Sequence, residues 1–123
     1  MALPYLLSLP THGVPNHGQL SVVEGAQLPF VVRRAYWIYG VPGGEGRGRH
    51  THRTLEQLMV AIGGELRITL ERPDFPRQTF TLTRPDQALY VPAGTWREVR
   101  FGAGAVLLCL ASQEYDEADY VRE

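Results

Sequence analysis

The 123-residue sequence predicts an all-β sandwich or barrel. Short apolar segments recur about every ten residues, and they are rich in β-branched and aromatic side chains. Glycine- and proline-containing turn signals separate these segments, and no segment shows a convincing amphipathic helical period. The length fits one domain over residues 1–123 with a single packed core.

The first half of the chain contains two expected strands before residue 40. The shorter one, at residues 20–24, follows the turn-forming sequence PNHG at residues 15–18, and the longer one occupies residues 30–39. A proline and four glycines then predict a loop over residues 41–48. The segment that follows this loop carries His50 and His52.

The rest of the chain contains six expected strands. Two of them, at residues 55–62 and 65–71, are separated by Gly63 and Gly64, the spacing of a tight hairpin whose turn needs positive φ. A proline-containing loop at residues 72–76 leads to an alternating strand at 78–83. Further strands are expected at residues 88–91, 95–101 and 105–111, and the acidic tail at 114–120 has room for one helical turn.

Composition excludes several function classes. The net charge of -1 argues against a general nucleic-acid-binding domain, which usually carries a basic excess. No apolar run approaches the roughly 18 residues that a membrane-spanning helix needs, and the N-terminal residues lack the features of a signal peptide. We therefore expect a cytoplasmic protein. The only cysteine, Cys109, lies in an apolar run and is predicted to be an inert core residue.

The basic residues are distributed unevenly. All twelve are arginine, and five of them stand close to the histidine pair in sequence: Arg33, Arg34, Arg47, Arg49 and Arg53. The planar guanidinium matches the oxygens of a phosphate group. As a group these arginines favour an anionic, phosphorylated ligand, although a solvated arginine-rich surface would also account for each one singly.

The histidine pair is the strongest functional signal in the sequence. Side chains alternate sides along a strand, so His50 and His52 lie on one face and can point into one cavity. Imidazole titrates near neutral pH, with a reference pKa of about 6.5. The pair therefore indicates either a metal site or a proton-transfer site.

The spacing around the pair matches a known motif. Metal-binding cupins, which are small jelly-roll β-barrels, have a first motif of the form G-x5-H-x-H-x3,4-E-x6-G. The residues of this chain that fit it are Gly44, His50, His52, Glu56 and Gly63.

The second cupin motif, P-x-G-x2-H, is incomplete. Residues 92–97 read PAGTWR, so Arg97 stands where the motif has its last histidine ligand. A guanidinium has no lone pair to offer and stays protonated, so it cannot ligate a divalent cation. This substitution favours a proton-transfer site without a metal. Two alternatives stay open: a three-ligand site of His50, His52 and Glu56, and a pair of histidines that are merely packed inside a barrel.

Further segments go beyond a generic cupin. They are RAYWIY at 34–39, RGRHTHRTLEQ at 47–57, LYV at 89–91, WRE at 96–98, LAS at 110–112 and YDEADYVR at 115–122. Together they resemble the sugar 3,4-ketoisomerases, which act on dTDP-4-keto-6-deoxy-D-glucose on the way to 3-amino-sugars. The resemblance extends from about residue 16 to the last residue.

The resemblance implies a metal-free cupin without a cofactor, and a homodimer that exchanges N-terminal strands. It also implies that His50 is the catalytic base, that His52 is its partner and that Tyr36 hydrogen-bonds an oxygen of the sugar. A neutral imidazole suits this chemistry, because the ketone moves from C4 to C3 through an enediol by proton transfer at pH 7. A fixed positive charge nearby would stabilise the enediolate.

The resemblance also suggests residues that bind the substrate. Arg47 is predicted to contact the diphosphate, with Arg34 and Arg53 as further candidates. Arg97 occupies a position that is arginine in the branch giving the gluco product and histidine in the galacto branch. The position before Gly18 is arginine or tyrosine in these branches, whereas here it is His17, which fits neither.

Two other functions stay open for a cupin of this sequence. One is a metal-dependent oxygenase or isomerase, and the other is a non-catalytic cupin that binds a nucleotide sugar. A 3,5-epimerase acting on the same substrate is a related possibility.

Overall fold

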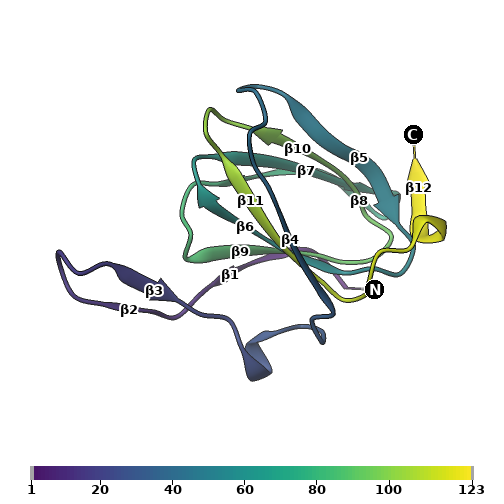
Figure 1. The fold of residues 1–123 in the computed structure, drawn as a ribbon. Coiled ribbons are helices and arrows are strands. Elements are labelled where there is room, and N and C mark those ends of the chain that lie inside the picture. Colours follow the sequence, from purple (N-terminus) through teal and green to yellow (C-terminus); the bar gives the residue numbers. More distant parts are fainter. Residues whose placement is uncertain (1, 123) are drawn as a thin grey trace.

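The computed structural model describes residues 2–122, which form two antiparallel sheets that face each other (Figure 1). The strands are β1 (Tyr5–Ser8), β2 (Thr11–Gly13), β3 (Gln19–Ser21), β4 (Arg34–Ile38), β5 (Gly46–His52), β6 (Gln57–Gly63), β7 (Leu66–Arg72), β8 (Phe75–Leu82), β9 (Gln87–Val91), β10 (Trp96–Phe101), β11 (Val106–Ala111) and β12 (Tyr120–Arg122). Two 3-10 helices, η1 (Gly25–Gln27) and η2 (Glu117–Asp119), are the only helical segments among the described residues. The predicted all-β class is therefore confirmed.

The first sheet has the order β1-β9-β6-β11-β4 and the second has the order β12-β5-β10-β7-β8. Their facing sides enclose the main core, to which β7 contributes Leu66, Ile68 and Leu70 and β10 contributes Val99 and Phe101. These residues are two apart because alternate side chains of a strand point to the same face. The two-residue apolar period of the sequence thus specifies which face of each strand is inside.

Cys109 on β11 is buried in this core, as predicted. Burial raises the pKa of its thiol to about 11, so the sulfur stays protonated at neutral pH. The thiol is consequently a packing element and not a nucleophile.

The expected hairpin at Gly63 and Gly64 is wrong. β6 pairs with β9 and β11, whereas β7 pairs with β8 and β10, so this joint crosses from one sheet to the other. Gly64 has the predicted positive φ, at +67°, and a Cβ there would stand 2.7 Å from the backbone of Ala105. Alternation shows which face of a strand is buried, but it does not show which strand lies beside it.

Other boundaries differ for the same reason. β5 begins at Gly46, inside the segment predicted to be a loop, because this segment pairs with β10. β8 begins at Phe75, so only two turn residues separate it from β7 instead of the expected five-residue loop. β1 and β2 were not expected from the sequence, and β3 covers Gln19–Ser21 instead of residues 20–24. In each case backbone hydrogen bonds to a neighbouring strand determine where the strand begins and ends, and local composition does not reveal which strand is the neighbour.

The β2–β3 hairpin extends away from the two sheets (Figure 1). Its turn holds His17, and its side chains include the exposed Val14 and Leu20. The acidic tail forms η2 and then β12, which pairs with β5 and brings Tyr120 opposite His52. The predicted helical turn in the tail is confirmed. Within residues 2–122, no helix is both long enough and apolar enough to cross a lipid bilayer.

Candidate active site

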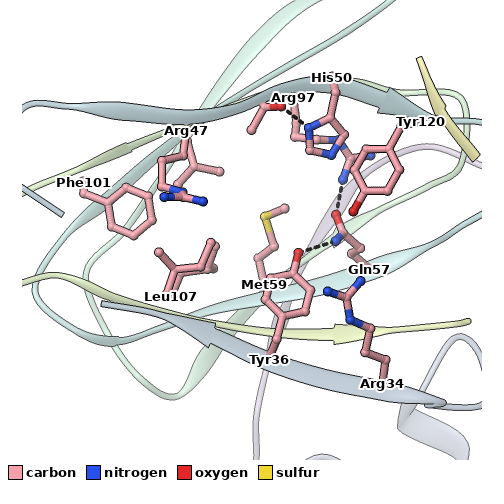
Figure 2. Close-up of a pocket in the computed structure, with 13 residues that line it drawn as sticks. Arg34, Tyr36, Arg47, His50, Gln57, Met59, Arg97, Phe101, Leu107 and Tyr120 are labelled. Atoms are coloured by element: carbon pink, nitrogen blue, oxygen red, sulfur yellow. Dashed lines mark hydrogen bonds between the residues drawn. The ribbon is translucent and has the colours of Figure 1, made fainter. Parts of the chain in front are cut away.

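A cavity of about 350 Å³ lies between the two sheets, with walls from both (Figure 2). One end is apolar and is formed by residues that include Phe101, Leu107 and Met59. The other end is polar, and its lining residues are His50, Tyr120, Arg97, Gln57, Tyr36 and Arg34. Arg47 also lines the cavity. The cavity thus brings together five of the residues expected to act in the site, namely Arg34, Tyr36, Arg47, His50 and Arg97.

A bulge in β5 sets the positions of Arg47 and His50. His50 pairs with Arg97 and Arg47 pairs with Val99, so two residues of β5 stand opposite one residue of β10. Side chains three positions apart on a regular strand point to opposite faces. The extra residue shifts this alternation by one position, so Arg47 and His50 both line the cavity. Gly48 lies in the bulge with φ of +99°, a backbone conformation that residues with a Cβ rarely adopt.

Replacing Gly48 by alanine is expected to lower the free energy of unfolding by about 1–3 kcal/mol through backbone strain. A Cβ at this position would meet Arg97 at an ordinary 3.6 Å, so no collision adds to that strain. Chemical denaturation measures the change, and Gly43→Ala is the control because its Cβ would meet nothing closer than 3.5 Å. Equal stability of the two variants would contradict the role of the bulge.

The two imidazoles contact each other directly. Nε2 of His50 lies 3.0 Å from Nε2 of His52, and the ring planes are nearly perpendicular at 85°. His50 lines the cavity, whereas His52 lies behind it and is only 2% exposed. Nδ1 of His50 bonds to the carbonyl oxygen of Gly48, and Nδ1 of His52 bonds to Oδ2 of Asp119 at 3.2 Å. The predicted histidine pair therefore exists as a hydrogen-bonded unit with one member lining the cavity.

Burial and neighbouring charges keep His52 neutral. Burial lowers its pKa most, the positive charge of Arg97 and the interaction with His50 lower it further, and Asp119 opposes the shift, so that the pKa falls to about 4. Burial also lowers the pKa of Arg97 to about 10, which leaves the guanidinium charged at pH 7. The polar end of the cavity therefore carries a permanent positive charge next to a neutral imidazole.

Arg97, Gln57 and Tyr36 form a chain of hydrogen bonds across the cavity (Figure 2). Arg97 donates from Nη1 to Oε1 of Gln57, and its Nε and Nη2 donate to the carbonyl oxygen of Thr95. Nε2 of Gln57 donates to the hydroxyl of Tyr36 at 2.8 Å. Because Gln57 occupies an acceptor site of this hydroxyl, the O–H itself is directed elsewhere. Burial raises the pKa of Tyr36 above its usual range, so the hydroxyl is a donor and not a phenolate.

Some expected residues are not part of the cavity wall. Arg53 is exposed just after β5, and its backbone N–H donates to the carbonyl oxygen of Asp119. His17 lies in the turn of the β2–β3 hairpin, outside the cavity of its own chain. Glu56 points away from the histidines, and its carboxylate accepts a hydrogen bond of 2.5 Å from Tyr90. Among residues 2–122, no three His, Cys, Asp or Glu side chains are arranged to hold a metal ion.

Three residues of the site were not assigned a role from the sequence: Gln57, Asp119 and Tyr120. Gln57 and Met59 are two positions apart on β6 and both line the cavity. Because alternate side chains of a strand share a face, Gln57 could have been identified from the sequence once the inner face of β6 was known. Asp119 and Tyr120 lie 67 and 68 positions after His52, and only tertiary structure brings them to the pair. Rings of Tyr120 and His52 have centroids 4.4 Å apart.

Residues 5–123 match the model of a protein family described as FdtA: WxcM-like, C-terminal. The TDP-4-oxo-6-deoxy-alpha-D-glucose-3,4-oxoisomerase of Aneurinibacillus thermoaerophilus is 37% identical to this chain over 112 residues, which cover 89% of this chain and 80% of that protein.

Two solved structures are closely similar in fold. The TDP-quinovose 3,4-ketoisomerase WlaRB of Campylobacter jejuni aligns with a TM-score of 0.92 at 34% identity, covering 100% of this chain and 95% of that one. A histidine-to-asparagine mutant of the 3,4-ketoisomerase QdtA of Thermoanaerobacterium thermosaccharolyticum, in complex with TDP-4-keto-6-deoxyglucose, aligns with a TM-score of 0.91 at 34% identity, covering 98% and 87%. The family match over nearly the whole chain and these relatives lead to one conclusion: the chain belongs to the FdtA family, described as WxcM-like, C-terminal.

Proposed function

We propose that this protein is a sugar 3,4-ketoisomerase that converts a TDP-linked 4-keto-6-deoxyglucose to the corresponding 3-keto sugar. The observation that carries the proposal is the hydrogen-bonded pair of His50 and His52 at the polar end of a cavity that Arg34 and Arg47 also line. The family relationship supports it, because a relative 37% identical is named as an oxoisomerase of this sugar nucleotide.

The reaction requires only proton transfers, which this site can perform. His50 takes the proton from C3, and the electrons of the C3–H bond form the C3=C4 double bond while the C4 oxygen is protonated. The resulting enediol loses the proton of its C3 hydroxyl, and C4 receives a proton from the imidazole. The hydroxyl of Tyr36 can donate to a sugar oxygen, and the charge of Arg97 favours the enediolate.

The arginines of the cavity account for an anionic substrate. Arg47 lines the cavity beside its apolar end, and Arg34 lies at the opposite end with its guanidinium 4.5 Å from the ring centroid of Tyr36 (Figure 2). We assign the diphosphate to Arg47, with Arg34 as a second cation. Arg53 is less suited to this role, since it is exposed outside the cavity wall. Arg97, at the position that separates the product branches, favours the gluco configuration.

Incubation with the 4-keto sugar nucleotide in heavy water tests the proposal. The expected result is a 3-keto isomer with deuterium at C4, and NMR of the product also reports whether its C4 configuration is gluco or galacto. Deuterium at C3 and C5 without a ketone shift would indicate a 3,5-epimerase instead. Tight binding without exchange would indicate a sensor, and loss of activity with a chelator, together with stoichiometric metal, would indicate a metal-dependent enzyme.

The active form is proposed to be a homodimer in which the N-terminal strands are exchanged. An isolated two-stranded hairpin is marginally stable, yet the β2–β3 hairpin extends from the sheets with Val14 and Leu20 exposed. The outer face of the first sheet also leaves Trp37 and Ile62 exposed at 59% and 47%. Apolar surfaces of this kind favour contact with a second copy. His17 lies outside the cavity of its own chain, and in an exchanged dimer its hairpin would extend toward the partner.

Light scattering should give a mass of about twice the 13.8 kDa of one chain. Trp37→Glu is expected to shift the protein toward monomer, because it places a charge on the apolar outer face. The control is Ala103→Glu, in the exposed turn between β10 and β11. A fully active wild-type monomer at assay concentration would refute the dimer. The expected cytoplasmic location stays a prediction.

A further inference from the structure

Gln57 connects two side chains of the site through a single amide group. The residue begins β6, the central strand of the first sheet, and its backbone pairs with Val91 of β9 and Ala111 of β11. Its side chain is 1% exposed and lines the cavity. Because neighbouring strands hold the backbone on both sides, the amide has a defined position between Arg97 and Tyr36 (Figure 2).

The orientation of this amide follows from its two partners. A guanidinium has only N–H donors and no acceptor, so the group of Gln57 that faces Nη1 of Arg97 must be the oxygen Oε1. The NH₂ group then faces Tyr36, and Nε2 donates to the hydroxyl oxygen at 2.8 Å. This bond uses the tyrosine oxygen as an acceptor, so the hydroxyl hydrogen points away from Gln57. All donors of the chain therefore point the same way, from Arg97 through Gln57 to Tyr36.

The cation at the start of this chain is held by neutral groups. Arg97 is 1% exposed, and its Nε and Nη2 donate to the carbonyl oxygen of Thr95 at 3.2 and 2.9 Å. In the part of the chain that the structure describes, Arg97 forms no ion pair with a carboxylate. A buried charge with neutral partners is costly, and a glutamate at position 57 would reduce that cost. Glutamine there leaves the charge uncompensated.

We propose, on the basis of the ketoisomerase function above, that Gln57 is a positioning residue of the reaction. Its amide directs the O–H of Tyr36 toward the substrate oxygen that becomes negative when C3 is deprotonated. Hydrogen bonds in such a chain polarise one another, so the charge of Arg97 strengthens the donor at the far end. Gln57 exchanges no proton itself, and the hydroxyl of Tyr36 is the group that contacts the substrate.

Gln57→Glu is expected to reverse the last hydrogen bond of the chain. An ionised carboxylate can only accept, so it would receive the N–H of Arg97 and also the O–H of Tyr36. The hydroxyl then no longer donates to the substrate, and kcat should fall about 10²-fold, the loss of one donor to a developing oxyanion. KM should change by less, because the diphosphate is assigned to Arg47 and Arg34.

Thermal unfolding separates positioning from a purely structural role. The melting temperature of Gln57→Glu should not fall, because the buried guanidinium gains a counter-ion of the same length as the original side chain. A structural role predicts instead that stability and kcat fall together. The control is Gln87→Glu on β9, where the side chain is partly exposed and does not line the cavity, so kcat should be unchanged.

The double variant Tyr36→Phe with Gln57→Glu tests whether Gln57 acts through the hydroxyl. Both changes remove the same donor, so the double variant should lose less activity than the product of the two single losses. A loss equal to that product would refute the positioning role. An unchanged kcat in Gln57→Glu would refute it as well.

The orientation of the amide is measured by NMR of the ligand-free wild-type protein. The side-chain NH₂ of Gln57 is expected to show stronger nuclear Overhauser contacts with the ring hydrogens of Tyr36 than with the guanidinium of Arg97. The opposite ranking would overturn the proposal, whatever any variant does. Since this measurement needs no substrate, the expected contacts in a protein without any turnover would refute the ketoisomerase function, and the positioning role with it, while the amide orientation would stand.

Discussion

Replacing His50 by asparagine is expected to lower kcat by about 10²- to 10⁴-fold, the usual contribution of a general base. His50 is the member of the pair that lines the cavity, so it is the group that can reach a C3 proton. Asparagine is close in size and can still hydrogen-bond to Nε2 of His52, but it cannot take up a proton at neutral pH. The effect is measured as the steady-state turnover of the 4-keto sugar nucleotide, which is monitored through deuterium incorporation at C4.

The control for this experiment is His12→Asn. His12 lies on β2, is exposed and does not line the cavity, so the same chemical change there should leave turnover intact. Circular dichroism of both variants shows whether the fold is retained. A folded His50→Asn protein with undiminished turnover would exclude His50 as the base.

Tyr36→Phe is expected to lower kcat by about 10²-fold, which is the loss found when one hydrogen-bond donor to a developing oxyanion is removed. Gln57 donates to the Tyr36 oxygen, and this contact leaves the hydroxyl hydrogen available to a substrate oxygen. The raised pKa of Tyr36 keeps that hydrogen in place at neutral pH. Phenylalanine fills the same volume but has no donor, and it also leaves Nε2 of Gln57 without its partner.

The measurement is kcat and KM with the 4-keto sugar nucleotide for Tyr36→Phe and Tyr39→Phe. Tyr39 follows the same strand and is 70% exposed, so its substitution should not affect the reaction. A fall in kcat for Tyr36→Phe with KM nearly unchanged would show that the hydroxyl acts in the transition state. An unchanged kcat would reduce Tyr36 to a packing residue.

Much of the candidate site could be predicted from local pattern. The single residue between His50 and His52 places both rings on one face of a strand, and the structure has them 3.0 Å apart at Nε2. The replacement of a motif histidine by Arg97 indicated a cation in the cavity, and Arg97 is there. These inferences depend only on side-chain alternation and on the chemistry of single residues.

Other parts of the site could not be predicted in this way. Strict alternation from His50 would turn Arg47 outward, and the bulge at Gly48 brings it into the cavity. The motif spacing suggested Glu56 as a partner of the histidines, but Glu56 bonds to Tyr90 and the next residue, Gln57, faces the cavity instead. A change of one position reverses the face of a strand residue, so spacing without register is ambiguous.

The sequence by itself determined the β-sheet class, the shared face of the two histidines and the cationic character of the cavity, because each follows from residue chemistry and a two-residue period. Only the tertiary structure decided which strands are neighbours, that Gly63 and Gly64 join two sheets, and that Asp119 hydrogen-bonds a histidine 67 positions earlier. The physical reason is that backbone pairing and side-chain hydrogen bonds between distant segments depend on three-dimensional proximity, which local sequence pattern does not encode.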